Sequence, residues 1–381
     1  LKDRLGRSIE NVASIRPPRH GKDLRTSIDL RLQYLAYRTL KSAIKSHNAR
    51  SGSIVVLDVK TGEVLAMVNQ PTYNPNDRSQ LAAERYRNRA ITDIFEPGSS
   101  LKPLVVAAAL ESGQYRPSSI IDTAPGFIVV GPKKIEDSRN LGRVSLTTIL
   151  ARSSNVGSTK LAMTLQPDQL WETMTDFGLG ELTSSGFPGE SAGMLTHYSN
   201  WRPISQATLA YGYGVSVTPL QLAQAYAALG SNGQMRPVSL VAIDAPGEGP
   251  QVLSEETATS VRRMLEEVVR PGGTGTKAAI DGYRVAGKTG TAWKFATGGF
   301  SQDKYISIFA GLAPASDPRL ATVVVIDEPG GELYYGSDVA APVFADVMAE
   351  SLRLLAVAPD ALPARDPGSV VQAVAARPES Q

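Results

Sequence analysis

A serine and a lysine three positions apart are the first residues in this chain that could carry out covalent chemistry. They are Ser99 and Lys102, in the stretch Phe95-Glu96-Pro97-Gly98-Ser99-Ser100-Leu101-Lys102-Pro103. Pro97-Gly98 is a turn signal, and the Ala-rich apolar run that follows predicts a helix, with Ser99 at its N-terminus and Lys102 one turn further on. A lysine can take the proton of a serine hydroxyl if burial or nearby positive charge lowers its pKa. The pair therefore predicts a serine nucleophile beside a lysine base.

The Ser-x-x-Lys spacing alone is not specific, because it occurs twice more in the chain. Ser42 and Lys45 lie in a segment with helical periodicity, where a solvated face explains both residues. Ser301 and Lys304 follow a glycine pair, and we interpret that segment as a loop. Partners elsewhere in the chain must therefore decide which serine reacts.

Two downstream motifs supply the partners that acyl transfer needs. Ser153-Ser154-Asn155 falls in a break between predicted helices, and Lys288-Thr289-Gly290-Thr291 falls on a predicted strand. Acyl transfer needs a base, a proton donor for the leaving amine and two N–H donors for the oxyanion. The strand can present backbone N–H groups, Gly290 allows a substrate backbone to lie close, and the threonine hydroxyls with the Lys288 charge suit a carboxylate.

Both downstream motifs have a second match in the chain. Lys60-Thr61-Gly62 repeats the Lys-Thr-Gly sequence, but it precedes Ser99 and joins two predicted strands, so turn chemistry explains it. Tyr198-Ser199-Asn200 matches the Tyr-x-Asn variant of the middle motif, although its neighbours indicate a loop. We favour Ser153 over Tyr198, because a side chain between two helices can be held in a cleft.

The elements that must position these residues predict an α+β fold. The strands form a hairpin near the start and an antiparallel group near the end, at 53–59, 63–68, 283–291, 305–312 and 321–327. Helices are expected near 27–48, from Ser99 onward, and at 146–151, 158–165, 168–177, 218–229, 255–269 and 337–356. We interpret 70–94 as a loop and 113–145 as irregular. The result is a five-stranded antiparallel sheet covered by helices on both faces, with a helical block inserted between about residues 70 and 275.

Bulk composition excludes several functions. The 381 residues are 42% hydrophobic and carry a formal net charge of +2, so we expect no nucleic-acid partner. There is no cysteine, and the three histidines have no metal-ligand spacing, so we expect neither a metal nor a Ser-His-Asp triad. No apolar run is long enough to span a membrane. Residues 1–25 are expected to be a connector from a missing N-terminal region, and residues 357–381 a disordered tail.

The three motifs in this order are similar to those of the penicillin-binding proteins, and most similar to class B septal, cell-division transpeptidases of Gram-negative bacteria. The resemblance covers about residues 26–355, and further segments carry it: Glu96-Pro97-Gly98, Gly186-Phe187-Pro188-Gly189-Glu190, Ala210-Tyr211-Gly212-Tyr213-Gly214 and Ala286-Gly287-Lys288-Thr289-Gly290-Thr291-Ala292. It implies a transpeptidase domain at 26–356 with the DD-transpeptidase/β-lactamase-like fold.

The resemblance also implies roles for single residues. Ser99 would attack the D-Ala-D-Ala carbonyl of a peptidoglycan stem peptide, with Lys102 as general base. Ser153 would relay a proton to the leaving D-alanine within a network that includes Lys102 and Lys288, and Asn155 would bind the substrate amide. Backbone N–H groups of Ser99 and Thr291 would hold the oxyanion, hydroxyls of Thr289 and Thr291 the carboxylate, and Tyr305, Tyr334 and Tyr335 would line the side-chain pocket. The three tyrosines could equally be core or rim residues.

The chain departs from the septal pattern at Ser100, Leu101 and Trp293, which could retune inhibitor preference or mark a specialised paralogue. The resemblance implies no cofactor. It implies β-lactam inhibitors, membrane-bound divisome proteins and a glycosyltransferase as partners, and a place on the periplasmic face of the inner membrane through an anchor absent from this chain. A DD-carboxypeptidase and a non-catalytic penicillin sensor or scaffold remain alternatives. A β-lactamase is disfavoured, because no Glu-x-x-Leu-Asn segment lies between Ser153 and Lys288.

Overall fold

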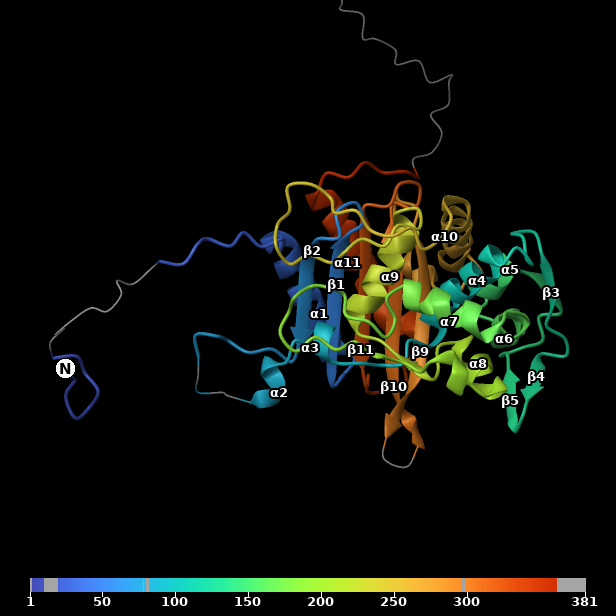
Figure 1. Cartoon of the computed structure of the whole chain (residues 1–381), viewed down its shortest axis with the longest axis horizontal. Helices are drawn as coiled ribbons and strands as arrows, with labels where there is room; N and C mark the ends of the chain where they lie inside the picture. The colour runs from blue at the N-terminus through green and yellow to red at the C-terminus, as the bar shows by residue number, and fades with distance from the viewer. Residues whose placement is uncertain (1, 10–19, 78, 80–81, 297–298, 362–381) are drawn as a thin grey trace, which may run out of the picture.

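A single antiparallel sheet forms the centre of the protein. The structure is a computed structural model that describes residues 2–9, 20–77, 79, 82–296 and 299–361. Within these residues the sheet has five strands in the order β2-β1-β11-β10-β9 (Figure 1). Their bounds are β1 Ser51–Asp58, β2 Val64–Gln70, β9 Ala286–Ala296, β10 Gly299–Ala313 and β11 Leu320–Asp327. The predicted fold class is confirmed.

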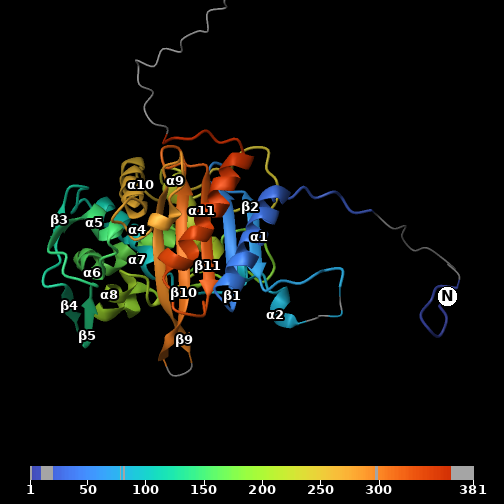
Figure 2. The same cartoon turned by 180° about the vertical axis from the view of Figure 1, so that it is seen from behind.

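Two helices cover one face of the sheet (Figure 2). They are α1 (Leu30–Ser46), which begins at the N-cap Asp29, and α11 (Gly336–Leu354). Their apolar sides pack together and on the strands around buried Leu40, Phe309 and Phe344. The inner strands β1 and β11 are buried on both faces, which explains why each contains an unbroken apolar run, 54–57 and 323–326, rather than an alternating pattern.

A helical block covers the other face. Its central helix, α9 (Pro219–Gly230), is buried at every residue, because it lies between the sheet and the other helices. Thr218 begins this helix by accepting a hydrogen bond from the backbone N–H of Gln221. The other helices of this part of the chain are α2 Ala83–Tyr86, α3 Arg89–Thr92, α4 Lys102–Glu111, α5 Leu146–Ala151, α6 Asn155–Thr164, α7 Pro167–Asp176, α8 Pro203–Leu209 and α10 Glu255–Val269.

Several predictions about the helical block are wrong in detail. The segment 113–145, predicted as irregular, contains four short strands in two small sheets, with bounds β3 Ile120–Asp122, β4 Phe127–Val130, β5 Lys133–Glu136 and β6 Arg143–Ser145. These strands have three or four residues each, too few for a periodic pattern to appear in the sequence. Helices α2 and α3 lie in the predicted 70–94 loop, and α8 was not predicted. Three short 3-10 helices, labelled η, also occur within the described residues, at η2 Gly98–Leu101, η3 Tyr198–Asn200 and η4 Thr276–Ala278. Two further short strands are β7 Met194–Leu195 and β8 Val215–Ser216.

The ends of the chain are described only in part. Residues 1, 10–19 and 362–381 of the predicted connector and tail lie outside the described residues. Residues 357–361 differ from the expected disordered tail, because they are bonded to the domain. Tyr283 Oη donates to the Val357 carbonyl at 2.6 Å, and Asp360 accepts from the Arg284 N–H at 2.7 Å. None of the described helices combines the length and apolar character needed to cross a bilayer.

Candidate active site

Ser99 lies in a rigid turn between the sheet and α4. Short helix η2 (Gly98–Leu101) runs directly into α4, so the prediction that Ser99 lies at a helix N-terminus is confirmed. Gly98 has a positive φ of 53°, and a β-carbon there would lie 3.1 Å from the Thr291 carbonyl oxygen. The buried Tyr226 hydroxyl on α9 donates to the Ser100 carbonyl at 2.8 Å. These contacts fix the turn against β9 and α9.

Lys102 is completely buried and points into the motif between α5 and α6. Its Nζ lies 2.6 Å from the Ser153 carbonyl oxygen, 3.2 Å from Ser153 Oγ and 2.8 Å from Asn155 Oδ1. Burial, reinforced by the nearby charge of Lys288, holds the pKa of Lys102 well below its ordinary value, while Asp137 acts in the opposite direction. The local geometry therefore favours a neutral amine at this position.

Ser153 has a strained backbone that serves this contact. Its φ is +57°, in the left-handed region, which costs a residue with a β-carbon about 1–2 kcal/mol. The residue connects α5 to α6, and the Ser153 N–H still bonds to the Leu150 carbonyl at 3.2 Å. The turn leaves the Ser153 carbonyl and hydroxyl facing Lys102. Strain of this kind is retained where surrounding structure requires an unusual geometry.

Asp137 organises the same motif, and sequence reasoning missed it. Its carboxylate accepts hydrogen bonds from Ser154 Oγ at 2.6 Å, from Asn155 N–H at 2.6 Å and from Val156 N–H at 3.0 Å. Two of the first backbone N–H donors of α6, and the hydroxyl of its N-cap Ser154, are thereby satisfied by one negative charge at a helix N-terminus. The only available signal was that α6 has no acidic residue in its own first turn.

Lys288 is also completely buried, on strand β9. Burial lowers its pKa to about 7. Its Nζ lies 3.3 Å from the Thr289 carbonyl oxygen and 3.4 Å from Thr289 Oγ1, so the hydrogen bonds described for it go to Thr289 rather than to Ser153. Thr289 Oγ1 is 3.0 Å from Thr274 Oγ1. The predicted single network is therefore two separate sets of hydrogen bonds, one between Lys102 and Ser153 and one between Lys288 and Thr289.

Gly290 lies where the turn that carries Ser99 meets strand β9. A β-carbon at this position would lie 2.9 Å from the Pro97 carbonyl oxygen and 3.2 Å from Ile308 Cβ. The glycine thus allows the turn that carries Ser99 to pack directly on β9. The predicted approach of a substrate backbone at Gly290 stays a prediction.

Six of the predicted site residues line a cleft of about 260 Å³, which we call the catalytic cleft, whereas Lys102, Ser153, Lys288, Thr289 and Gly290 are not among its lining residues. Ser99, Asn155 and Thr291 line it together with a wall of aromatic side chains: Tyr211, Tyr213, Trp293, Tyr305, Tyr334 and Tyr335. Tyr305 stacks on Tyr334 with ring centroids 4.0 Å apart, so the three predicted tyrosines belong to the lining rather than to the core. In the sequence, Tyr211 and Tyr213 belong to a segment that resembles the family, and Trp293 is a departure from the family's pattern. None of the three was predicted to line the site.

The alternative motifs lie elsewhere. The Tyr198 ring packs against Trp171 and His197, with centroids 5.7 and 4.3 Å away, and Tyr198 does not line the catalytic cleft. Ser42 and Lys45 are exposed on α1, as predicted. Ser301 and Lys304 lie on β10 rather than in a loop, and Lys304 pairs with Glu328 at 3.1 Å.

No hydrogen bond joins Ser99 Oγ to Lys102 among the contacts of the described residues. Bonds of this kind commonly tighten only when substrate binds. The structure also shows no group of three or more acidic or histidine side chains within the described residues that could hold a metal ion.

Known proteins resemble this chain over most of its length. The family described as "Penicillin binding protein transpeptidase domain" matches residues 52–349. The chain is 47% identical over 370 residues to "Peptidoglycan D,D-transpeptidase FtsI" of Escherichia coli, an alignment that covers 97% of this chain and 62% of that protein. It is 42% identical to "Probable peptidoglycan D,D-transpeptidase PenA" of Neisseria flavescens, covering 94% of this chain and 90% of that protein.

A solved structure shows the same fold. The transpeptidase domain of penicillin-binding protein 3 from Burkholderia pseudomallei superposes with a TM-score of 0.82 at 41% identity, covering 89% of this chain and 98% of that one. This chain therefore belongs to the penicillin-binding protein transpeptidase family. It spans 62% of the length of the Escherichia coli relative.

Proposed function

We propose that residues 26–356 form a serine DD-transpeptidase that cross-links peptidoglycan in septal cell-wall synthesis. Ser99 attacks the D-Ala-D-Ala carbonyl of a stem peptide and expels D-alanine, leaving an acyl-enzyme. The amine of a neighbouring strand then attacks the ester and restores the serine. One observation carries the proposal: Lys102 is a buried lysine with a lowered pKa, one turn after Ser99, and it contacts both Ser153 and Asn155.

The contacts of Lys102 define a path for the proton. A neutral amine has two N–H donors, which go to the Ser153 carbonyl and to Asn155 Oδ1, the two shorter contacts. Its lone pair is then free to accept a proton from Ser99 as the new C–O bond forms. Ser153 Oγ, 3.2 Å from the amine, passes a proton on to the leaving D-alanine nitrogen and is reprotonated by Lys102. Asn155 holds the amine and presents its amide to the substrate.

The β9 side of the cleft recognises the end of the acyl donor. Thr291 Oγ1 accepts the Gly336 N–H at 2.9 Å, so its own hydrogen is available to a carboxylate oxygen. Thr289 and the positive form of Lys288 add a hydroxyl and a charge beside it. The backbone N–H groups of Ser99 and Thr291 receive the oxyanion. Tyr305, Tyr334 and Tyr335 contact the donor side chain.

The same chemistry explains the inhibitors and partners that we assign to the protein. β-Lactams mimic the D-Ala-D-Ala end, acylate Ser99 and remain attached. We place the domain at the periplasmic face of the inner membrane, held by an N-terminal anchor outside this sequence, where it works with divisome proteins and a glycosyltransferase. The Escherichia coli relative, named a peptidoglycan D,D-transpeptidase, supports this assignment.

Fluorescent penicillin tests the nucleophile. The wild type should become labelled, Ser99→Ala should not, and Ser42→Ala, which removes an exposed serine with the same Ser-x-x-Lys spacing, should label like the wild type. Equal labelling of Ser99→Ala would overturn the assignment. An adduct that persists for hours excludes a β-lactamase, whereas rapid loss of label with drug turnover would favour one.

Turnover of a stem-peptide thioester separates the remaining alternatives. With a D-amino acid as acceptor, we expect the aminolysis product to accumulate. A hydrolysed product alone would indicate a carboxypeptidase, and stoichiometric acylation without turnover would indicate a sensor.

A further inference from the structure

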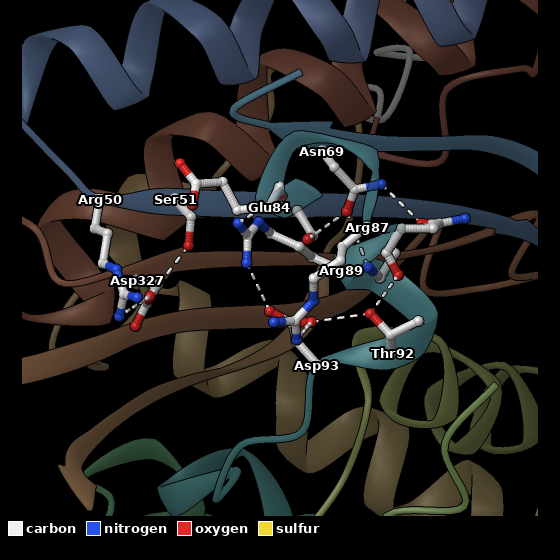
Figure 3. A network of polar contacts seen from close by, with 12 residues as sticks. Arg50, Ser51, Asn69, Glu84, Arg87, Arg89, Thr92, Asp93 and Asp327 are labelled. Carbon is white, nitrogen blue, oxygen red and sulfur yellow. Dashed lines mark hydrogen bonds and ion pairs between the residues drawn. The ribbon is translucent and has the colours of Figure 1, made fainter. Parts of the chain in front are cut away.

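A second cavity lies at the end of the central sheet, where its lining residues Lys294 and Ile306 directly follow Trp293 and Tyr305 of the catalytic cleft. Its volume is about 370 Å³, against about 260 Å³ for the cleft, and the two share no lining residue among those described. It forms where α3 and the chain that follows it meet the ends of β1, β9, β10 and β11 (Figure 3). We call it the strand-end cavity.

Positive charge is in excess in the strand-end cavity. Four cationic side chains among the described residues line it, against two carboxylates, which leaves two positive charges uncompensated: Arg50, Arg87, Arg89 and Lys294 against Asp93 and Asp327. Glu328 bonds to Arg50 at 2.9 Å and to Lys294 at 2.7 Å, and it also pairs with Lys304 at 3.1 Å, so including Glu328 and Lys304 leaves a net excess of two positive charges. An excess of this kind in a concave site attracts an anion.

The carboxylates leave many of the cationic donors unused. Arg87 and Arg89 both bond to Asp93, and the Ser51 hydroxyl bonds to Asp327 (Figure 3). Lys294 also bonds to Asp327. A guanidinium has five N–H donors. Within the described contacts, one hydrogen bond is formed by Arg87 and one by Arg50, and the buried Nε of Arg89 has no partner.

The other walls of the strand-end cavity are apolar. Ile94, Phe95, Ile306 and Val325 line it, and Ile94 has 46% of its surface exposed. Phe95, Ile306 and Val325 are already buried, so a free inorganic anion would leave the exposed surface of Ile94 uncovered. A ligand that carries an apolar group next to its charge would cover Ile94 and gain from its burial.

We propose that the strand-end cavity binds a small amphipathic carboxylate, such as the C-terminal residue of a peptide that ends in a branched apolar side chain. The planar carboxylate fits the fork of a guanidinium, with Arg50 and Arg87 at the open side. The apolar group lies against Ile94 and Ile306. This site does not depend on the proposed function, because none of its residues belongs to the catalytic cleft.

Methyl NMR spectroscopy can test the site directly. Protein with labelled isoleucine δ1 methyl groups is titrated with 3-methylbutanoate, its neutral amide, acetate and inorganic phosphate. We expect saturable shifts of Ile94 and Ile306, assigned with Ile94→Val and Ile306→Val, for 3-methylbutanoate. The amide, acetate and phosphate should each bind at least about tenfold more weakly, since each lacks the charge or the apolar group. The Trp293 indole signal reports on the catalytic cleft in the same samples, so binding there is recognised separately.

A double variant tests the two open-side arginines. Arg50→Gln together with Arg87→Gln removes the two excess positive charges. The ion pairs of Lys294 with Glu328 and of Arg89 with Asp93 stay in place. We expect at least about a tenfold loss of 3-methylbutanoate affinity, because two charge-assisted contacts disappear. Arg353→Gln, an exposed arginine at the end of α11 that pairs with Glu350, is the matched control and should bind like the wild type. Thermal unfolding confirms that both proteins are folded.

Three results would overturn the proposal. The first is the absence of saturable shifts at Ile94 and Ile306. The second is equal binding of the amide or of phosphate, which would mean that the cavity selects neither charge nor apolar surface. The third is unchanged affinity in the folded double variant.

Discussion

Replacing Lys288 by methionine should stabilise the folded protein while weakening its reaction with β-lactams. Burial lowers the pKa of Lys288 from 10.5 to about 7, so folding is opposed by the loss of the charged form that the unfolded chain keeps. At pH 7 this difference is worth roughly 4 kcal/mol. Methionine has a similar length and no charge to bury. The two long contacts with Thr289 are lost, at a cost of about 1 kcal/mol. The expected net gain at pH 7 is therefore roughly 3 kcal/mol.

The pH dependence gives this prediction a distinctive signature. Between pH 7 and about 10, the unfolded chain holds a proton at Lys288 that the folded protein does not, so wild-type stability rises with pH. The slope approaches about 1.4 kcal/mol per pH unit for this one lysine. The variant lacks this contribution, so its advantage should shrink from roughly 3 kcal/mol at pH 7 to about zero near pH 10.

Equilibrium urea unfolding of both proteins from pH 6 to 10 measures this difference. Lys45→Met, which changes an exposed lysine on α1, is the control and should follow the wild type at every pH. Fluorescent penicillin should acylate Lys288→Met more slowly, since the carboxylate of the drug loses its cationic partner. A variant that is less stable than the wild type at pH 7, or an advantage that does not change with pH, would refute the reasoning.

Three further substitutions test the structures around the site. Asp137→Ala should lower the free energy of unfolding by about 2–4 kcal/mol, because it leaves the first N–H donors of α6 without a partner. It should also slow acylation, because Asn155 is no longer held in place. Urea unfolding measures the first effect and penicillin labelling the second, and a wild-type value for either would contradict the assigned role. Gly290→Ala should cost about 1–3 kcal/mol and slow acylation, because the added carbon meets the Pro97 carbonyl oxygen at 2.9 Å. Tyr198→Phe should leave the acylation rate within about twofold of the wild type, since the side chain packs on α7 rather than in the cleft. A loss of acylation rate of more than about tenfold would instead support Tyr198-Ser199-Asn200 as the middle motif.

The sequence predicted those parts of the fold and site that short-range patterns control. The turn at Pro97-Gly98 and the apolar run after it placed Ser99 and Lys102 on one helix start, as found. The antiparallel order of β9, β10 and β11 followed from their short connections. Lys60-Thr61-Gly62 is a turn between β1 and β2, where Gly62 has a φ of +80°.

Long-range packing determined what the sequence could not show. Asp137 belongs to the site because the chain after β5 lies against the start of α6, and no spacing in the sequence records that contact. The sequence also could not show that Gly290 packs against the Pro97 carbonyl, nearly 200 positions earlier. Ser301 and Lys304 were placed in a loop because their glycine neighbours suggested one, whereas they lie on β10 at a register shift, between the positions 300 and 305 that pair with β9.

The pH dependence of acylation in wild type and Lys102→Arg tests the central claim most directly, since arginine keeps a long side chain with N–H donors but stays protonated and cannot act as a base near neutral pH. Because the pKa of Lys102 lies well below its ordinary value, the wild type should acylate readily at pH 7 and slow down as acid protonates the amine. Lys102→Arg should be slower by about 10² or more at every pH. An arginine variant that acylates at the wild-type rate would show that Ser99 is activated by some other group.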